Sequence, residues 1–320
     1  MSASFKKTYP LVSIIIPCFN YGRFLAEALD SAANQTYPNI EIIIIDDGST
    51  DNSRVVAENY IKTHNKSPVR YLYQTNKGII ETRNRGVRLA KGEYIIQLDA
   101  DDILDHKYVS ETIRTSKRHG VKIVYTDVEI IGRENRRQYF SDFSLDTLKY
   151  QNFIHASSLV HTSVFKDLKY DPALDKLGYE DWDIFLGACL NGFTAARNKK
   201  VVLYYRKHSA MNSRSDEVSA VYNLLKSRNY IHEKYIKLFP NDMRALEPLV
   251  KIHKKILEDN KLHKKVKEDY EYSKSVNKRM ANRISSLEST LDKYQSSRAF
   301  KICRVVNNFY NKAKGSLRNE

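Results

Sequence analysis

The chain has 320 residues, of which 42% are hydrophobic and 28% are charged, and it contains 11 glycines and 7 prolines. This composition is typical of a globular protein and excludes collagen-like, mucin-like and disordered chains. Its three cysteines form no CxxC pair, which argues against a disulfide framework and a zinc site and favours a cytoplasmic protein. No apolar run approaches the roughly 20 residues that a membrane-spanning helix needs.

The formal net charge of +15 is concentrated in the C-terminal third of the chain. Residues 1–216 carry 30 Lys and Arg residues and 26 Asp and Glu residues, whereas residues 217–320 carry 23 and 12. A basic surplus of this kind predicts an anionic partner for the C-terminal part, which is membrane lipid, nucleic acid or an acidic glycan.

Short apolar runs alternate with helical patterns through the first hundred residues. The expected strands are Val12–Ile16, Ile40–Ile45, Val69–Tyr73 and Tyr94–Leu98. Apolar residues recur at helical spacing in the segments between them, most clearly at 79–90. Purely apolar runs are typical of parallel strands that are buried on both faces. Three successive βαβ units therefore predict a doubly wound α/β sheet.

Ligands bind such sheets beyond the carboxyl ends of the strands, so the residues that follow each run form the candidate site. These segments are 17–20, 46–51, 74–78 and 99–102, and acidic residues dominate two of them. No GxGxxG pattern follows the first strand, which argues against a nicotinamide or flavin enzyme.

The fourth expected strand ends in three carboxylates within four residues, Asp99, Asp101 and Asp102. Like charges at this spacing repel one another unless water, a cation or basic side chains neutralise them. Mg²⁺ and Mn²⁺ bind one or two carboxylates together with substrate phosphates, so one interpretation is a divalent metal site. The other is a solvated acidic turn before a helix that begins near His106.

A second acidic segment, residues 46–51, follows the second expected strand. Ser49 or Asp51 is suited to cap the helix that comes next. Asp47 is the better ligand candidate, because a carboxylate that faces the crevice accepts the imide N–H of a pyrimidine base.

Five segments resemble, in the same order, the motifs of glycosyltransferase family 2: VSIIIPCFN at 12–20, IDDGSTD at 45–51, TRNRG at 82–86, KGEYIIQLDADD at 91–102 and GYEDWD at 178–183. The resemblance covers roughly residues 10–210. It implies a GT-A fold, which is a Rossmann-like mixed sheet, and an inverting enzyme that moves a sugar from a nucleotide-sugar donor, of the UDP type, to an acceptor hydroxyl. The acceptor would be a glycan or a lipid-linked molecule in the synthesis of a cell-surface polysaccharide or glycolipid.

The resemblance also implies roles for individual residues. The donor would be bound by Pro17, Phe19, Asp47, Arg83 and Asp99. A divalent cofactor, Mn²⁺ or Mg²⁺, would be bound by Asp101 or Asp102. His208 resembles a family histidine near the diphosphate or the metal, although a solvated histidine in a basic loop is the alternative.

Asp181 would be the catalytic base that takes the proton from the acceptor hydroxyl. Partial burial would raise the pKa of an ordinary aspartate toward that task. Glu180 and Trp182 would belong to the acceptor site, with Trp182 as its wall. No QxxRW motif of polymerising family members occurs in the sequence, which implies single additions.

The expected organisation is a GT-A domain at residues 1–216 and a basic helical extension at residues 217–320. Apolar residues between 280 and 294 follow heptad spacing, which predicts a short coiled coil, with a homodimer as one consequence, or a bundle helix. Residues 298–319 contain six basic residues, no acidic residue and an apolar stripe. This segment fits either a bundle helix or an interfacial helix that holds the protein on the inner face of the plasma membrane. Nucleic acid is the weaker partner, because no recognised motif accompanies the charge.

Two rival functions remain from the sequence. A sugar nucleotidyltransferase would need a glycine-rich, basic phosphate loop after the first strand, and residues 17–22 do not supply one. A non-catalytic glycan-binding or membrane-binding scaffold of the same fold is the other rival. The intact carboxylates Asp99, Asp101 and Asp181 argue against that scaffold.

Overall fold

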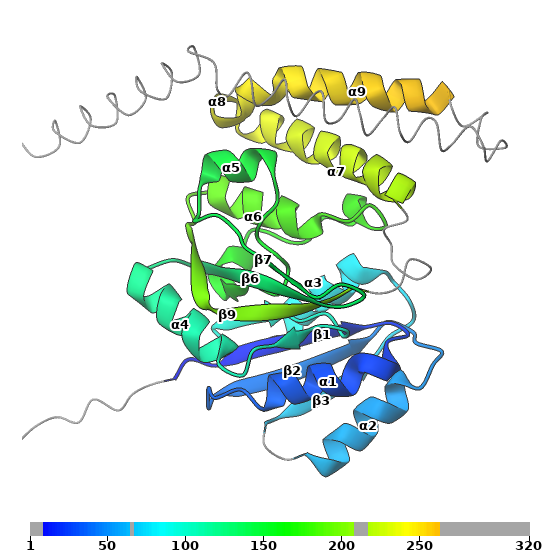
Figure 1. The fold of residues 1–320 in the computed structure, drawn as a ribbon, viewed down its shortest axis with the longest axis vertical. Coiled ribbons are helices and arrows are strands. Elements are labelled where there is room, and N and C mark those ends of the chain that lie inside the picture. Colours follow the sequence, from blue (N-terminus) through cyan, green and yellow to red (C-terminus); the bar gives the residue numbers. More distant parts are fainter. Residues whose placement is uncertain (1–8, 65–66, 208–216, 263–320) are drawn as a thin grey trace, which may run out of the picture. The chain divides into compact units, whose positions relative to one another are not determined.

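The computed structural model describes residues 9–64, 67–207 and 217–262. In these residues nine strands form one mixed sheet in the order β3-β2-β1-β4-β8-β6-β9-β5, with β7 paired to β6 at the side (Figure 1). The chain divides into a compact unit of residues 1–255, which holds this sheet, and a second unit of residues 256–320. The coiled coil expected near 280–294 and the basic helix expected at 298–319 lie outside the described residues.

The N-terminal half of the sheet is parallel and confirms the predicted βαβ units. Its elements are β1 (Val12–Cys18), α1 (Gly22–Ala33), β2 (Ile40–Asp46), α2 (Ser53–Thr63), β3 (Val69–Tyr73), α3 (Ile79–Leu89) and β4 (Tyr94–Gln97). Strand β1 pairs in parallel with both β2 and β4, so their carboxyl ends meet at one edge of the sheet.

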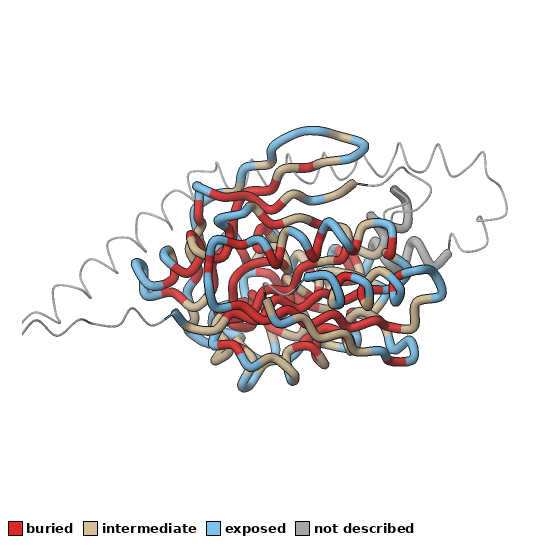
Figure 2. The backbone as a smooth tube through the Cα atoms, turned by 90° about the horizontal axis from the view of Figure 1, so that it is seen from below, coloured by how far each residue is buried: buried red, intermediate tan, exposed pale blue. Residues whose placement is uncertain are grey.

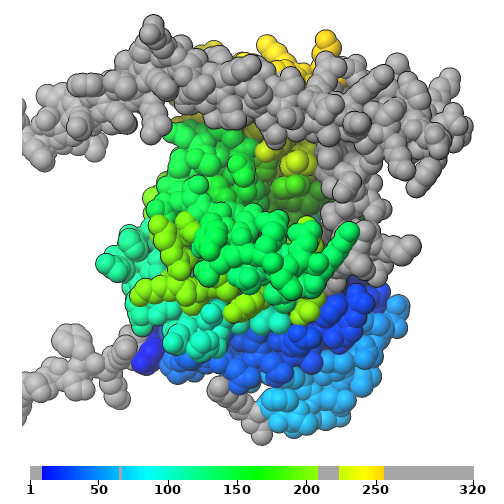
Figure 3. All heavy atoms as spheres, in the orientation of Figure 1, coloured from blue at the N-terminus to red at the C-terminus, as the bar shows by residue number. Residues whose placement is uncertain are grey.

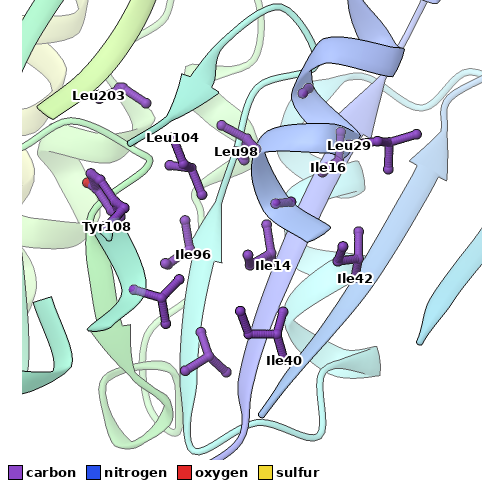
Figure 4. Close-up of a cluster of buried hydrophobic side chains, with 14 of the residues drawn as sticks. Ile14, Ile16, Leu29, Ile40, Ile42, Ile96, Leu98, Leu104, Tyr108 and Leu203 are labelled. Carbon is purple, nitrogen blue, oxygen red and sulfur yellow. The ribbon is translucent and has the colours of Figure 1, made fainter. Parts of the chain in front are cut away.

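Helices cover both faces of this parallel half, which explains why β1, β2 and β4 are fully buried and mainly apolar. Ile14, Ile16 and Ile42 point to the face that α1, α2 and α4 (Tyr108–His119) cover, as Figure 4 shows. Ile15 and Ile43, the alternate residues, point to the other face, where α3 packs. Each fully buried isoleucine stabilises the fold by roughly 1.5–3 kcal/mol, so a polar residue on either face would weaken it.

Antiparallel pairing makes the second half of the sheet mixed. Its further elements are β5 (Ile103–Leu104), β6 (Ile123–Gly132), β7 (Arg136–Gln138), α5 (Leu145–Tyr150), β8 (Leu159–His161), η1 (Thr162–Phe165), η2 (Pro172–Leu174), α6 (Glu180–Leu190) and β9 (Ala195–Lys207). Strand β8 lies between β4 and β6 and is antiparallel to both. The buried strands run through the centre of the backbone trace in Figure 2, and exposed loops surround them. In Figure 3 the green segment that contains β6 and β7 covers one face beside the blue surface of α1.

Four helical segments follow, α7 (Glu217–Leu238), α8 (Pro240–Met243), η3 (Arg244–Leu246) and α9 (Glu247–Leu262). Helix α7 ends at Leu238, and the short helix α8 begins two residues later at Pro240. Pro240 occupies the first helical position, where its missing N–H costs nothing. Among the described helices, none is both long enough and apolar enough to span a membrane.

Helix α7 packs tightly on α6. The hydroxyl of Tyr235 donates to the carbonyl oxygen of Asp183 at 2.7 Å. Gly187 on α6 makes room for this contact, because a Cβ there would collide with the Tyr235 ring. Lys234 also pairs with Asp183, at 2.7 Å. Helix α7 therefore buttresses the helix that carries the Glu-Asp motif.

Candidate active site

The loops after β1 and β2 are fixed to each other by Asn20. This residue adopts a left-handed conformation, with φ of 59°. Its side-chain oxygen accepts from the backbone N–H of Thr50 at 2.7 Å, and its own N–H donates to Ser49 Oγ at 3.0 Å. Pro17 is buried at the end of β1, and Phe19 is 44% exposed at the start of the loop. The segment expected to bind a nucleotide base is thus held rigidly, with one aromatic ring open to solvent.

Asp47 is buried and organises the next loop. Its Oδ1 accepts from the side-chain amide of Gln74 at 2.7 Å and from the backbone N–H of Lys77 at 2.8 Å. Its Oδ2 accepts from the backbone N–H of Gly78 at 2.9 Å. Gly78 has φ of 85°, a left-handed value that favours glycine. Asp47 therefore joins the ends of β2 and β3, a role that its sequence pattern does not indicate.

The acidic loop after β4 is anchored to β9 by Arg206. The Arg206 N–H donates to Oδ1 of Asp102 at 2.9 Å, and its Nε donates to the carbonyl oxygen of Asp101, also at 2.9 Å. Burial of the Asp102 carboxyl, followed by the charges of Asp101 and Asp99, raises its pKa well above the ordinary value. The three carboxylates therefore share one electrostatic environment. Arg206 thus holds this loop in place through its backbone and its side chain.

Arg83 on α3 is the one guanidinium paired with Asp99 in the described part of the chain. Its Nη2 lies 2.8 Å from Asp99 Oδ1 and 3.6 Å from Glu180 Oε1. The Arg83 side chain is only 4% exposed, whereas that of Asp99 is 34% exposed. Arg83 thus contacts Asp99 from within the protein, and Asp99 is the member of the pair that solvent reaches.

Asp181 lies in the first turn of α6. The chain enters this helix through two left-handed residues, Gly178 with φ of 81° and Tyr179 with φ of 67°. Asp181 Oδ1 accepts from Asn152 Nδ2 at 3.0 Å and from the N–H of Trp182 at 2.7 Å. Burial, and next the charge of Glu180, raises the pKa of Asp181 to about 7. A carboxylate with this pKa is suited to accept a proton near neutral pH.

Trp182 does not line a surface, so the expectation that it walls the acceptor site is wrong. Its side chain is fully buried, and its indole N–H donates to the carbonyl oxygen of Leu148 at 2.7 Å. The ring of His232 on α7 contacts it edge-on, with centroids 5.5 Å apart. Successive residues of a helix point about 100° apart, so the side chain that follows Asp181 on α6 points into the core. Trp182 supports the site from behind.

The described residues account for part of the proposed metal site. Asp101 and Asp102 lie in the loop after β4, whereas His208 lies outside the described residues. Within the described ranges, no group of three or more His, Cys, Asp or Glu side chains has the geometry to hold a metal ion by itself. Oxygen donors from one or two carboxylates nevertheless suit Mg²⁺ or Mn²⁺ where phosphate oxygens complete the shell. The donor set of this loop fits a cation that binds together with a diphosphate.

Two further polar residues belong to the site although no motif signals them. Asn152 binds Asp181, and Gln74 bonds both Asp47 and Thr82. Neither lies in a segment with a distinctive pattern. Only the position of Gln74 directly after an expected strand could have drawn attention to it.

The sequence has recognisable relatives. A profile of the family described as Glycosyl transferase family 2 matches residues 13–168. The glycosyltransferase GlyG of Streptococcus pneumoniae serotype 4 is 33% identical over 150 residues, which are 45% of this chain and 49% of GlyG. The chain carries a family 2 glycosyltransferase domain. Chondroitin synthase of Escherichia coli is 41% identical over 135 residues, 42% of this chain but 19% of that enzyme. The match thus spans about half of GlyG and less of the synthase.

Solved structures support the GT-A fold of this glycosyltransferase domain. S. aureus TarS in complex with UDP-GlcNAc superposes with a TM-score of 0.58 at 20% identity, over 69% of this chain and 66% of that one. The mannosyltransferase PcManGT from Pyrobaculum calidifontis, in complex with GDP-Man and Mn²⁺, gives a TM-score of 0.56 at 17% identity, over 72% and 65%. At these identities the likeness concerns the fold. The α/β class and the mixed sheet predicted from the sequence are confirmed.

Proposed function

We propose that this glycosyltransferase transfers one sugar from a nucleoside diphosphate donor to an acceptor hydroxyl, with inversion at the anomeric carbon. The observation that carries the proposal is the arrangement of Asp181, whose pKa is raised to about 7. It lies beside Glu180, which Arg83 connects to Asp99 at the donor loop. A proton acceptor and a donor-binding loop therefore share one buried arginine.

The donor is proposed to lie along the carboxyl ends of β1, β2 and β4. The exposed ring of Phe19 offers a face for the base, and Asp47 and Asp99 offer carboxylates for its polar groups. A UDP-type sugar is the first choice, because TarS is named in complex with UDP-GlcNAc. Because PcManGT is named in complex with GDP-Man, GDP-sugars are the second class of donor to test.

A divalent cation, Mn²⁺ or Mg²⁺, is proposed to be held by Asp101 and Asp102 together with the donor diphosphate, with His208 as a further ligand. Such a cation stabilises the negative charge of a leaving diphosphate as a Lewis acid. Arg206 keeps the loop in place by bonding its backbone and Asp102. PcManGT is named in complex with Mn²⁺, which supports a cation of this class.

The proposed transfer step uses Asp181 as the base. Its carboxylate takes the proton of the acceptor hydroxyl, and the hydroxyl oxygen forms a bond to C1 of the sugar. The bond between C1 and the diphosphate oxygen breaks on the opposite face, and the nucleoside diphosphate leaves with that electron pair. Asn152 and the N–H of Trp182 both bond Oδ1, and no donor in the described residues is bonded to Oδ2. Oδ2 is therefore the atom that receives the proton.

The acceptor is proposed to be a glycan or lipid-linked hydroxyl that approaches Glu180 and Asp181. Cytoplasmic synthesis of a cell-surface polysaccharide or glycolipid, at the membrane surface, would suit this acceptor. The GT-A domain at 1–216 would carry the chemistry, and the extension at 217–320 would bring the domain to an anionic membrane or to a second copy.

Release of nucleoside diphosphate from a panel of UDP-sugars and GDP-sugars, with Mn²⁺, with Mg²⁺ and with EDTA, tests the proposal. We expect one donor class to be turned over, only with a divalent cation. The value of kcat/KM should rise with pH through about 7 and level off above it, because Asp181 acts as a base only when deprotonated. Equal turnover with EDTA would exclude the metal role, and no turnover of any donor would contradict the proposed activity.

A further inference from the structure

Arg83 lies between two carboxylates that come from distant parts of the sequence. Asp99 follows β4, and Glu180 begins α6. The same atom, Nη2, lies 2.8 Å from Asp99 and 3.6 Å from Glu180. Asp181, the proposed base, is the next residue after Glu180. One guanidinium is therefore shared between the donor loop and the carboxylate beside the base.

The burial of Arg83 makes this sharing consequential. The guanidinium is almost fully buried, and within the described ranges its Nε and Nη1 form no hydrogen bond. Its carbon Cζ lies 5.9 Å from the centre of the Tyr170 ring, in a cation–π contact. Electrostatic interactions are stronger at such a site than in water. Arg83 is thus held mainly by the charges of Asp99 and Glu180.

The charged groups around Asp181 act on it in opposite directions. After burial, the charge of Glu180 is the largest cause that raises the pKa of Asp181, and the charge of Arg83 lowers it. Among the described residues, Tyr170 and Tyr179 also interact electrostatically with Asp181. Burial is the chief cause that raises their pKa values, and both are neutral near pH 7. Beyond burial, Glu180 and Arg83 are therefore the charged groups that act most strongly on the proton affinity of Asp181.

We propose that Arg83 is a positioning residue that couples the loop at 99–102 to the proposed base. By pairing with both Asp99 and Glu180, it sets the charge state of Asp181. The proposal rests on the proposed function, because it treats Asp181 as the base. In this arrangement Arg83 need not touch the substrate. It acts on the proton transfer through Glu180 and on the donor loop through Asp99.

The test compares Glu180→Gln, Arg83→Gln and Arg83→Lys in the full chain. Glu180→Gln removes the charge that disfavours the Asp181 carboxylate, so the acid limb of the kcat/KM profile should move down by about 1 pH unit. Arg83→Gln removes the favourable charge, so the limb should move up by a similar amount. Arg83→Lys keeps the charge and should leave the limb near its original position. Arg88→Gln, which breaks only the exposed pair with Glu81, is the matched control and should not move it.

A carboxyl ¹³C NMR titration of Asp181, assigned with Asp181→Asn, measures the same shifts in the free protein without turnover. If Arg83→Gln does not fold, because it leaves buried carboxylates unpaired, Glu180→Gln and the double variant Arg83→Gln/Glu180→Gln carry the test, and the double variant should titrate near the wild type. Acid limbs and titrations that stay unchanged in the folded variants would overturn the proposal. Shifted titrations in a protein whose transfer does not need Asp181 would instead contradict the proposed function alone.

Discussion

The site has two groups of neighbouring carboxylates, three in the loop at 99–102 and two at 180–181, and their surroundings in the fold differ. The acidic loop at 99–102 follows a strand, and Asp99 remains one-third exposed at the edge of the sheet. Glu180 and Asp181 begin a helix whose other face is packed under α7, and burial raises the pKa of Asp181 to about 7. A strand end presents charge to a ligand at the water boundary, whereas a packed helix start can adjust proton affinity. In the proposed function, donor binding and proton transfer therefore belong to different elements.

The comparison is tested most directly by Asp181→Asn. We expect transfer to fall by roughly 10²- to 10⁴-fold, the range for loss of a general base, with donor affinity unchanged. Steady-state transfer and calorimetric binding of the nucleoside diphosphate measure the two effects. Asp167→Asn, at an exposed aspartate, is the matched control. A variant that loses donor affinity but keeps turnover would show that Asp181 binds the donor and is not the base.

Lys234→Met tests whether α7 supports the start of α6, where Glu180 and Asp181 lie. Lys234 Nζ lies 2.9 Å from Asp171 Oδ2 and 2.7 Å from Asp183 Oδ2, and the Asp183 side chain is 1% exposed. Removal of the cation leaves the buried Asp183 carboxylate without its cationic partner. The free energy of unfolding in urea should therefore fall by about 2–4 kcal/mol at pH 7.5.

A double variant and a control variant distinguish this effect from a general loss of charge. Lys234→Met/Asp183→Asn should recover much of the stability, because it also removes the buried charge of the Asp183 carboxylate. Lys254→Met breaks an exposed pair with Glu233 and should cost only about 0–1 kcal/mol. Equal costs for Lys234→Met and Lys254→Met would mean that α7 does not support α6.

Asp101→Asn tests the proposed cation site in the loop at 99–102 and has the smallest expected effect. Loss of one carboxylate from the proposed cation site should weaken binding of a nucleoside diphosphate about tenfold in Mn²⁺, because other oxygen donors remain. In EDTA the variant and the wild type should bind equally. Asp142→Asn, which affects an exposed pair with Lys199, is the control for calorimetry. A tenfold loss that persists in EDTA would show that Asp101 acts without a metal.

The parallel half of the sheet could be predicted because each of its strands is a short run of mainly apolar residues. The first run was expected at 12–16, and the strand extends to Cys18. The periodicity of the first three helices was equally direct. Antiparallel β8 has only three residues and no such run, so the insertion of β8 between β4 and β6 could not be read from local pattern.

The candidate site was predictable only where motif residues sit at strand or helix ends. The motifs located Asp99 and Asp181, but not the pairing of Arg83 with Glu180 about a hundred residues away. Trp182 was misplaced because spacing along the chain does not say which side of a helix faces the core. Asn152 was missed because an isolated asparagine in a loop has no pattern, and only the folded chain brings it to Asp181.

The strand order also has a consequence for synthesis of the chain. Strand β4 pairs on one side with β1, but its other side pairs with β8, which ends at His161. At 5–20 residues per second, about 3–13 s pass between the emergence of β4 and that of β8. For this interval the growing sheet has an open, apolar edge on which another nascent chain could form a strand. Expression at reduced translation rate should therefore increase aggregation rather than relieve it.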